Sequence, residues 1–299
     1  AFSYSANWHG MLGIIGVPGA LFFMGALALP ESPRWLMTRG RDDEAARVLM
    51  KLRDDPAAVA SERREIAAQL RNPQHGWRLF VENKNFRRSV GLGVLLQIVQ
   101  QFTGINIVMY YAPRIFESMG YRTQAQLWFT AAVGLVNVLA TLIAVRFVDK
   151  WGRKPILYSG FATMAIGLGV VGAMMHTGMR TESAQLLAVA MLLVFIVGFA
   201  CSAGPVIWIL CSEIQPIQGR EFGMSLATMS NWLSNFVIDG TFLTVLKHFG
   251  RAPTFWLYTG LNVAFLFVVV LLVPETKNVT LEFIERNLMA GKRLRQIGR

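Results

Sequence analysis

The sequence predicts an all-helical membrane protein, and three observations support this fold class. Hydrophobic residues make up 54% of the 299 residues and charged residues only 16%, which is unusual for a water-soluble domain. The apolar residues form runs of about twenty, the length of helix that crosses a bilayer. Lys and Arg lie between these runs, so the net charge of +11 indicates membrane orientation and not a nucleic-acid partner.

Seven apolar segments are long enough to be membrane spans. After the first span comes a polar stretch with helical patterning in residues 42–53 and 61–71, which we expect to be a helical cytoplasmic insert over residues 31–89. The remaining spans follow one another with short connections, and a tail of residues 274–299 follows the last. The predicted spans cover residues 8–29, 90–118, 126–147, 155–177, 184–210, 222–246 and 253–273.

The orientation follows from the distribution of basic residues. If the insert is cytoplasmic, 24 of the 29 Lys and Arg lie on the cytoplasmic side and five on the other. We therefore expect a multi-pass membrane protein with a cytoplasmic C-terminus and Ala1 outside. Because the chain begins with Ala1 and shows no signal peptide, we expect it to be part of a longer chain.

A short motif occurs twice in the chain and indicates an internal repeat. Pro30-Glu31-Ser32 ends the first span and Pro274-Glu275-Thr276 ends the seventh, with six spans between them. This spacing favours a six-span unit over residues 90–273, preceded by the last span of another unit in residues 1–30, as in transporters built from parallel halves. The alternative is that Pro and Glu simply mark two helix exits.

The second span holds a density of amide side chains that is costly in lipid unless they face protein or water. Gln97, Gln100, Gln101 and Gly104 share one face of a helix, and Asn106 begins a second face. A break at Gly104 would merge the two faces into the lining of a cavity. The alternative is that the amides only bond neighbouring helices.

Three other spans supply polar or aromatic groups that fit the same cavity. Asn137 lies in the third span, Gly204 and Trp208 in the fifth, and Asn231 and Asn235 in the sixth. The last two pairs have i, i+4 spacing, so each pair shares a helix face. Amides both donate and accept hydrogen bonds, and a Trp ring packs on a sugar ring, so the set suits a neutral polyhydroxylated solute. The alternative for Trp208 taken alone is an apolar wedge between helices.

Charged residues gather at two predicted cytoplasmic loops, residues 149–154 and 213–220. Opposite charges at span ends can form a latch that closes in one conformation and opens in another. Solvated anchors that only set the topology are the alternative. The four His residues have no zinc spacing and there is no phosphate-binding loop, so we expect no enzyme activity, no metal and no cofactor.

Four motifs, in this order along the chain, resemble the sugar porter family of the major facilitator superfamily. They are Pro30-Glu31-Ser32-Pro33-Arg34-Trp35-Leu36, Gln100-Gln101-Phe102-Thr103-Gly104-Ile105-Asn106, residues 149–153 and Pro274-Glu275-Thr276-Lys277. The segments 109–113, 208–216 and 279–298 look most like bacterial galactose and arabinose proton symporters.

The resemblance implies twelve helices in two six-helix bundles with the sugar held between them. This chain would run from span six onward, and its partners would be the sugar, a proton, the bilayer and the missing N-terminal bundle. Tyr110 and Tyr111 would form the extracellular gate. The implied sugar site is Gln100, Gln101, Asn106, Asn137, Gly204, Trp208, Asn231 and Asn235, and the implied cytoplasmic charge network is Glu31, Arg34, Asp149, Arg153, Glu213, Arg220 and Glu275.

Sugar:proton symport leads among the functions that fit. A facilitated uniporter would use the same site, and a non-transporting sensor is disfavoured because the tail of about 25 residues is short. The particular hexose or pentose stays open. Asp239 replaces a residue that is usually small and apolar in these symporters. We expect it to be hydrated near the outer mouth, with the coupling carboxylate in the missing spans; the alternative is that Asp239 itself titrates during transport.

Overall fold

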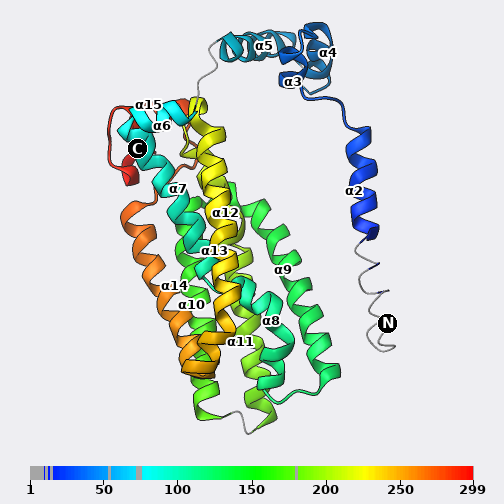
Figure 1. The fold of residues 1–299 in the computed structure, drawn as a ribbon, viewed down its shortest axis with the longest axis vertical. Helices are drawn as coiled ribbons and strands as arrows, with labels where there is room; N and C mark the ends of the chain where they lie inside the picture. Colours follow the sequence, from blue (N-terminus) through cyan, green and yellow to red (C-terminus); the bar gives the residue numbers. More distant parts are fainter. Residues whose placement is uncertain are drawn as a thin grey trace. The chain divides into compact units, whose positions relative to one another are not determined.

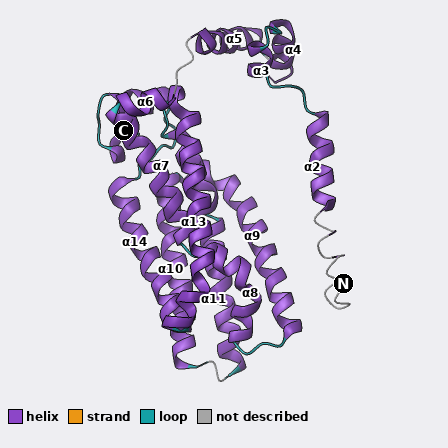
Figure 2. Cartoon of the chain, in the orientation of Figure 1, coloured by secondary structure: helices purple, strands orange, loops and turns teal. Residues whose placement is uncertain are grey.

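The computed structural model describes residues 10, 13, 16–52, 55–71, 76–178 and 181–298, and this part of the chain contains helices and no strand (Figure 2). It divides into two compact units, Ala1–Pro73 and Gln74–Arg299. The polar stretch of residues 31–89 therefore contributes to both units. The assignment of this stretch as one cytoplasmic insert stays a prediction.

In the first unit the described residues form helices α2 (Gly16–Ala28), α3 (Pro33–Thr38), α4 (Asp42–Leu52) and α5 (Pro56–Arg71). Helices α3, α4 and α5 pack together, and they bury Leu36, Ala45, Leu49 and Val59. Helix α2 is the described part of the predicted first span; it is apolar and its side chains are exposed. Residues 1–9, 11, 12, 14 and 15 of that region lie outside the described residues.

The second unit is a bundle of long helices (Figure 1). Helix α10 packs against α11 and α14, α7 packs against α13, and α8 packs against α9. A helix occupies each of the predicted spans two to seven. The elements are α6 (Gly76–Glu82), α7 (Lys84–Phe102), α8 (Ile105–Ser118), α9 (Thr123–Trp151), α10 (Arg153–Thr177), α11 (Glu182–Ala200), α12 (Ala203–Glu213), η1 (Ile217–Gly219), α13 (Arg220–Phe249), α14 (Arg251–Leu272), α15 (Leu281–Met289) and η2 (Leu294–Gln296).

Five helical segments of the described chain are long and apolar enough to cross a membrane. They cover residues 84–117, 123–151, 153–177, 182–213 and 251–272. Helix α13 is not among them although it has 30 residues, because Asn231, Asn235 and Asp239 interrupt its apolar sequence. Those polar side chains need partners within the bundle.

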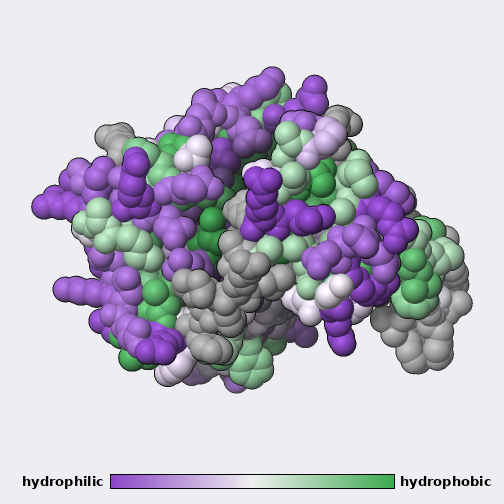
Figure 3. Space-filling view, turned by 90° about the horizontal axis from the view of Figure 1, so that it is seen from above, coloured by the Kyte–Doolittle hydropathy of each residue, from purple (hydrophilic) through white to green (hydrophobic). Residues whose placement is uncertain are grey.

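The helices of the second unit share one charged end, where α10 begins and α12 and α14 finish. Gly152 ends α9 with φ 90°, a conformation that favours glycine, and α10 begins at the next residue. Helices α6 and α15 lie at this end (Figure 1), and seen from there hydrophilic residues predominate on the surface (Figure 3).

Candidate functional site

The predicted break in the second span is present. Helix α7 ends at Phe102, and α8 starts at Ile105 after Gly104, whose φ of 91° is strained for residues with a side chain. A Cβ atom at Gly104 would also lie 3.0 Å from Cδ1 of Tyr258 on α14. Glycine is therefore required here both by the backbone conformation and by the close approach of an aromatic ring.

Amide side chains join this broken helix to α13 in a series that we call the amide ladder. Asn231 Nδ2 donates to Gln97 Oε1 at 2.6 Å and to Gln100 Oε1 at 2.8 Å. One turn further along α13, Asn235 Nδ2 lies 3.4 Å from Gln101 Oε1. Gln101 Oε1 also accepts from Asn106 Nδ2 at 2.5 Å. The break therefore brings both predicted faces together, as the spacing of the amides indicated.

The amide ladder reaches α12 through the backbone. Gln100 Nε2 donates to the carbonyl oxygens of Ala203 at 2.8 Å and Gly204 at 3.1 Å. These bonds lie just after a second break, between α11 and α12, which the sequence analysis did not predict. Pro205 is the signal that could have revealed it, because proline has no N–H to continue a helix.

Asn262 on α14 is a site residue that the sequence analysis missed. Its side chain is fully buried, and its Nδ2 donates to the carbonyl oxygens of Thr103 at 3.1 Å and Tyr258 at 2.8 Å. Asn262 thus binds a main-chain acceptor exposed by the break at Gly104 and connects α14 to it. A lone amide in an otherwise apolar span was the available signal.

Three predicted residues make weaker or no contacts with the amide ladder. Trp208 is 37% exposed, and Asn137 on α9 is half-buried with no side-chain hydrogen bond in the described chain. Tyr110 is 59% exposed, whereas the neighbouring Tyr111 turns toward α13. The Tyr111 hydroxyl lies 3.4 Å from the main-chain oxygen of Asp239, and its ring centroid is 4.8 Å from that of Phe242.

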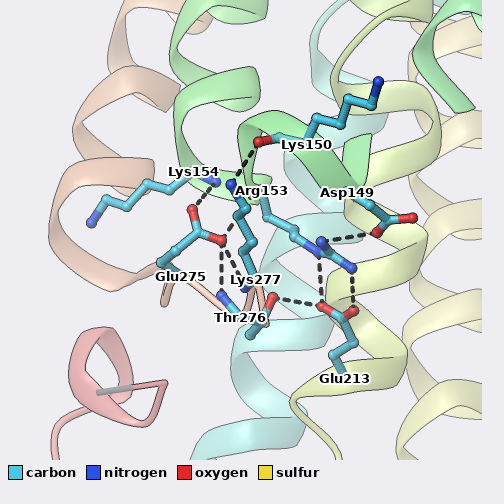
Figure 4. Close-up of polar contacts among 8 residues, drawn as sticks. All are labelled: Asp149, Lys150, Arg153, Lys154, Glu213, Glu275, Thr276 and Lys277. Atoms are coloured by element: carbon cyan, nitrogen blue, oxygen red, sulfur yellow. Dashed lines mark hydrogen bonds and ion pairs between the residues drawn. The ribbon is translucent and has the colours of Figure 1, made fainter. Parts of the chain in front are cut away.

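A second cluster of contacts lies at the charged end, and Figure 4 shows it. Arg153, at the start of α10, binds Glu213, at the end of α12, through two hydrogen bonds of 2.7 and 3.3 Å. Their side chains are only 10% and 18% exposed. Asp149 lies 3.2 Å from Arg153, and the Thr276 hydroxyl donates to Glu213 at 2.6 Å. The predicted loops therefore meet in a largely buried ion pair.

Glu275 contributes to this cluster by binding backbone groups. Its carboxylate accepts from the N–H groups of Arg153 and Lys154 at 3.0 Å each, and so satisfies the N-terminus of α10. It also accepts from the N–H groups of Thr276 at 3.0 Å and Lys277 at 2.9 Å. A carboxylate at a helix N-terminus is favoured by the helix dipole.

Three more residues were predicted for the charge network. Among the described residues, Arg220 donates to the carbonyl oxygen of Gln215 at 3.5 Å, and its buried Nε has no partner. Its part in the network stays a prediction. Glu31 and Arg34 belong to the first unit, so their part in the network stays a prediction.

The chemistry of the site is that of neutral hydrogen bonding. No cluster of His, Cys, Asp and Glu that could hold a metal occurs among the described residues. The amide ladder offers donors and acceptors at a helix break, which is the kind of site where transporters bind solutes. The Arg153–Glu213 ion pair, by contrast, joins the start of α10 to the end of α12. It is distant from the break at Gly104 both in sequence and along the length of the helices.

The sequence profile described as "Sugar (and other) transporter" matches residues 1–288. The chain belongs to this family. It is 56% identical over 299 residues to the galactose-proton symporter of Escherichia coli K12 and 53% identical over 302 residues to the arabinose-proton symporter of the same strain. Both alignments cover 100% of this chain but only 64% of the relative, so the chain spans less than two thirds of their length.

Solved structures support the same fold. The proton:xylose symporter XylE bound to 6-bromo-6-deoxy-D-glucose matches with a TM-score of 0.76 and 33% identity, covering 97% of this chain and 58% of that chain. An inward open conformation of the Escherichia coli xylose transporter XylE matches with a TM-score of 0.72 and 32% identity, covering 94% and 57%. The predicted all-helical major facilitator fold is confirmed by these similarities, and the related proteins are transporters.

Proposed function

We propose that this chain is the C-terminal part of a twelve-span transporter that takes up a neutral monosaccharide together with a proton. The observation that carries the proposal is the amide ladder at the break between α7 and α8. The names of the related proteins support a sugar and a proton as the transported species. Alternating access would need a second bundle that rocks against this one around a shared site.

In this proposal the sugar binds beside the amide ladder, between the two bundles. Its hydroxyl groups bond to amide side chains, and Trp208 packs against the sugar ring. Tyr111 and Tyr110 close the site from the outer side. The proposed sugar contacts are Gln100, Gln101, Asn106, Asn137, Gly204, Trp208, Asn231 and Asn235.

The Arg153–Glu213 pair would act as a latch at the cytoplasmic surface of the inner membrane. It would hold α10 and α12 together while the cavity opens outward and separate when the cavity opens inward. The first-unit helices α3–α5 would lie in the cytoplasm with the tail.

Uptake by the full-length protein tests the function. Cells that express it should accumulate labelled galactose, arabinose or xylose, and a protonophore should abolish the accumulation. Saturable uptake that the protonophore does not affect would indicate a uniporter. Absence of uptake of all three sugars would contradict the proposal.

Substitutions at the amide ladder test the sugar site. Asn106→Ala in the full-length protein should weaken sugar binding by about 1 to 3 kcal/mol, roughly 5- to 150-fold, because a hydroxyl group or Gln101 loses its partner. Trp208→Ala should also weaken binding. Isothermal titration calorimetry measures both effects, and unchanged affinity in both variants would exclude this site.

Cysteine labelling tests the orientation. Ser183→Cys and Lys292→Cys are introduced singly after Cys201 and Cys211 are replaced. In intact cells an impermeant maleimide should label position 183, which we place outside, and leave position 292 unlabelled until the cells are opened. Labelling of position 292 but not of 183 would reverse the topology.

A further inference from the structure

The amide ladder continues one helical turn beyond Asn235 to a residue of different chemistry. Asn231, Asn235 and Asp239 are spaced by four residues along α13, so their side chains lie one above the other on neighbouring parts of its surface. Each of these three residues of α13 has a neighbour on the broken helix α7–α8. Asn231 bonds Gln97 and Gln100. Asn235 approaches Gln101, and Tyr111 approaches Asp239.

Of these three side chains, only that of Asp239 forms no hydrogen bond to a described residue of the broken helix. The Tyr111 hydroxyl is directed to the main-chain oxygen of Asp239 and not to its carboxylate. Within the part of the chain that the structure describes, Oδ1 of Asp239 is shielded from solvent and has no hydrogen-bond partner, and no Lys, Arg or His forms an ion pair with this residue. The expectation that this carboxylate is hydrated stays a prediction. A buried acceptor without a partner is unfavourable, so this position needs a donor from elsewhere.

The residues around Asp239 and the chemistry of a carboxylate indicate which hydrogen-bond donor could pair with it. Tyr111 on α8 packs against Phe242, one turn further along α13, and Tyr258 on α14 lies against Gly104 at the break. These residues belong to the elements that flank the proposed sugar site. A carboxylate only accepts hydrogen bonds, and those it accepts are stronger than those between neutral groups.

We propose that Asp239 is a further sugar-contacting residue that determines specificity at the outer end of the site. This inference rests on the proposed sugar-transport function. Its carboxylate accepts a hydrogen bond from one sugar hydroxyl, and it favours a protonated amino group at that carbon still more. It disfavours a substituent that cannot donate, such as fluorine, and repels a sugar acid.

Deoxyfluoro sugars test this contact in the full-length protein, because fluorine replaces a hydroxyl group but cannot donate. We measure calorimetric affinities for galactose and for its 2-, 3-, 4- and 6-deoxyfluoro analogues in the unsubstituted protein, Asp239→Asn and Asp239→Ala. One analogue should bind the unsubstituted protein roughly 10-fold more weakly than galactose. In Asp239→Ala this difference should fall below about 3-fold. The matched control is Glu117→Gln, which neutralises an exposed carboxylate on α8 and should keep the full difference.

The outcomes separate this inference from the proposed function. Thermal unfolding of Asp239→Asn should match that of the unsubstituted protein, since Oδ1 of Asp239 has no hydrogen-bond partner among the described residues to lose. The role of Asp239 would be overturned if the analogue affinities showed the same pattern in all three proteins. If Asn106→Ala still weakened galactose binding in that case, the proposed sugar site would remain supported. If none of galactose, arabinose and xylose binds the unsubstituted protein, the proposed function itself fails, and this inference with it.

Discussion

Replacing Glu213 by Ala should lower the free energy of unfolding by about 3 kcal/mol, the largest single effect that we expect. Arg153 is only 10% exposed and would keep just one carboxylate partner, Asp149, which is itself 78% exposed. A largely buried guanidinium without a close partner is costly, and Thr276 would lose its acceptor as well. Chemical denaturation in detergent, followed by circular dichroism, measures the loss.

A second substitution of Glu213 tests the proposed latch between Arg153 and Glu213. Glu213→Gln keeps the size of the side chain and removes its charge, so it should shift the full-length protein toward inward-open states while sugar contacts remain. The control is Glu82→Gln, which removes one partner of an exposed ion pair with Arg78 and should change stability by less than about 1 kcal/mol. Disulfide crosslinking of Arg153→Cys with Glu213→Cys should depend on the conformation. Equal crosslinking in outward-open and inward-open states would argue against a latch.

Replacing Asn231 by Ala should be the next most destabilising change, by about 2 kcal/mol, because two buried acceptors lose their donor together. Gln97 and Gln100 are 0% and 3% exposed, and the Oε1 atom of each accepts from Asn231. The variant therefore leaves two unsatisfied oxygens inside the bundle. Thermal unfolding of the purified protein measures this loss.

Asn235→Ala is the matched control, since it makes the same substitution one turn along the same helix. Asn235 is half-buried and its bond to Gln101 is long, at 3.4 Å, so the loss of stability should stay below about 1 kcal/mol. Sugar affinity should nevertheless fall, because we place Asn235 at the sugar. A stability loss as large as that of Asn231→Ala would contradict the difference in burial on which the two predictions rest.

The sequence was sufficient to predict the broken second span. The regular spacing of Gln97, Gln100 and Gln101, followed by Gly104, defines a polar helix face and a point where the face must change. These are local properties, and the structure confirms the break. The break between α11 and α12 depends on the same kind of local signal, Gly204-Pro205, yet the high apolarity of this segment masked it.

Contacts between distant helices could not be predicted in the same way. Asn262 lies 159 residues from its partner Thr103, and no periodicity in α14 indicates which carbonyl it will meet. The charge network shows the same limit. The pairing of Arg153 with Glu213 could be expected from opposite charges at helix ends, but the bond of Arg220 to the main-chain oxygen of Gln215, on the other side of η1, could not be predicted from the composition.

The backbone contacts of Glu275 have a consequence for biosynthesis. The N–H groups that begin α10 are synthesised about 120 residues before the carboxylate that binds them. At roughly 10 residues per second, α10 spends about 12 seconds without this partner while α11 to α14 are being made. A ribosome that stops before Glu275 therefore releases a bundle in which α7 to α14 are present but the first two N–H groups of α10 lack this carboxylate. The uncapped start of α10 is a chemical difference by which quality-control proteases can distinguish this truncated product from the finished one.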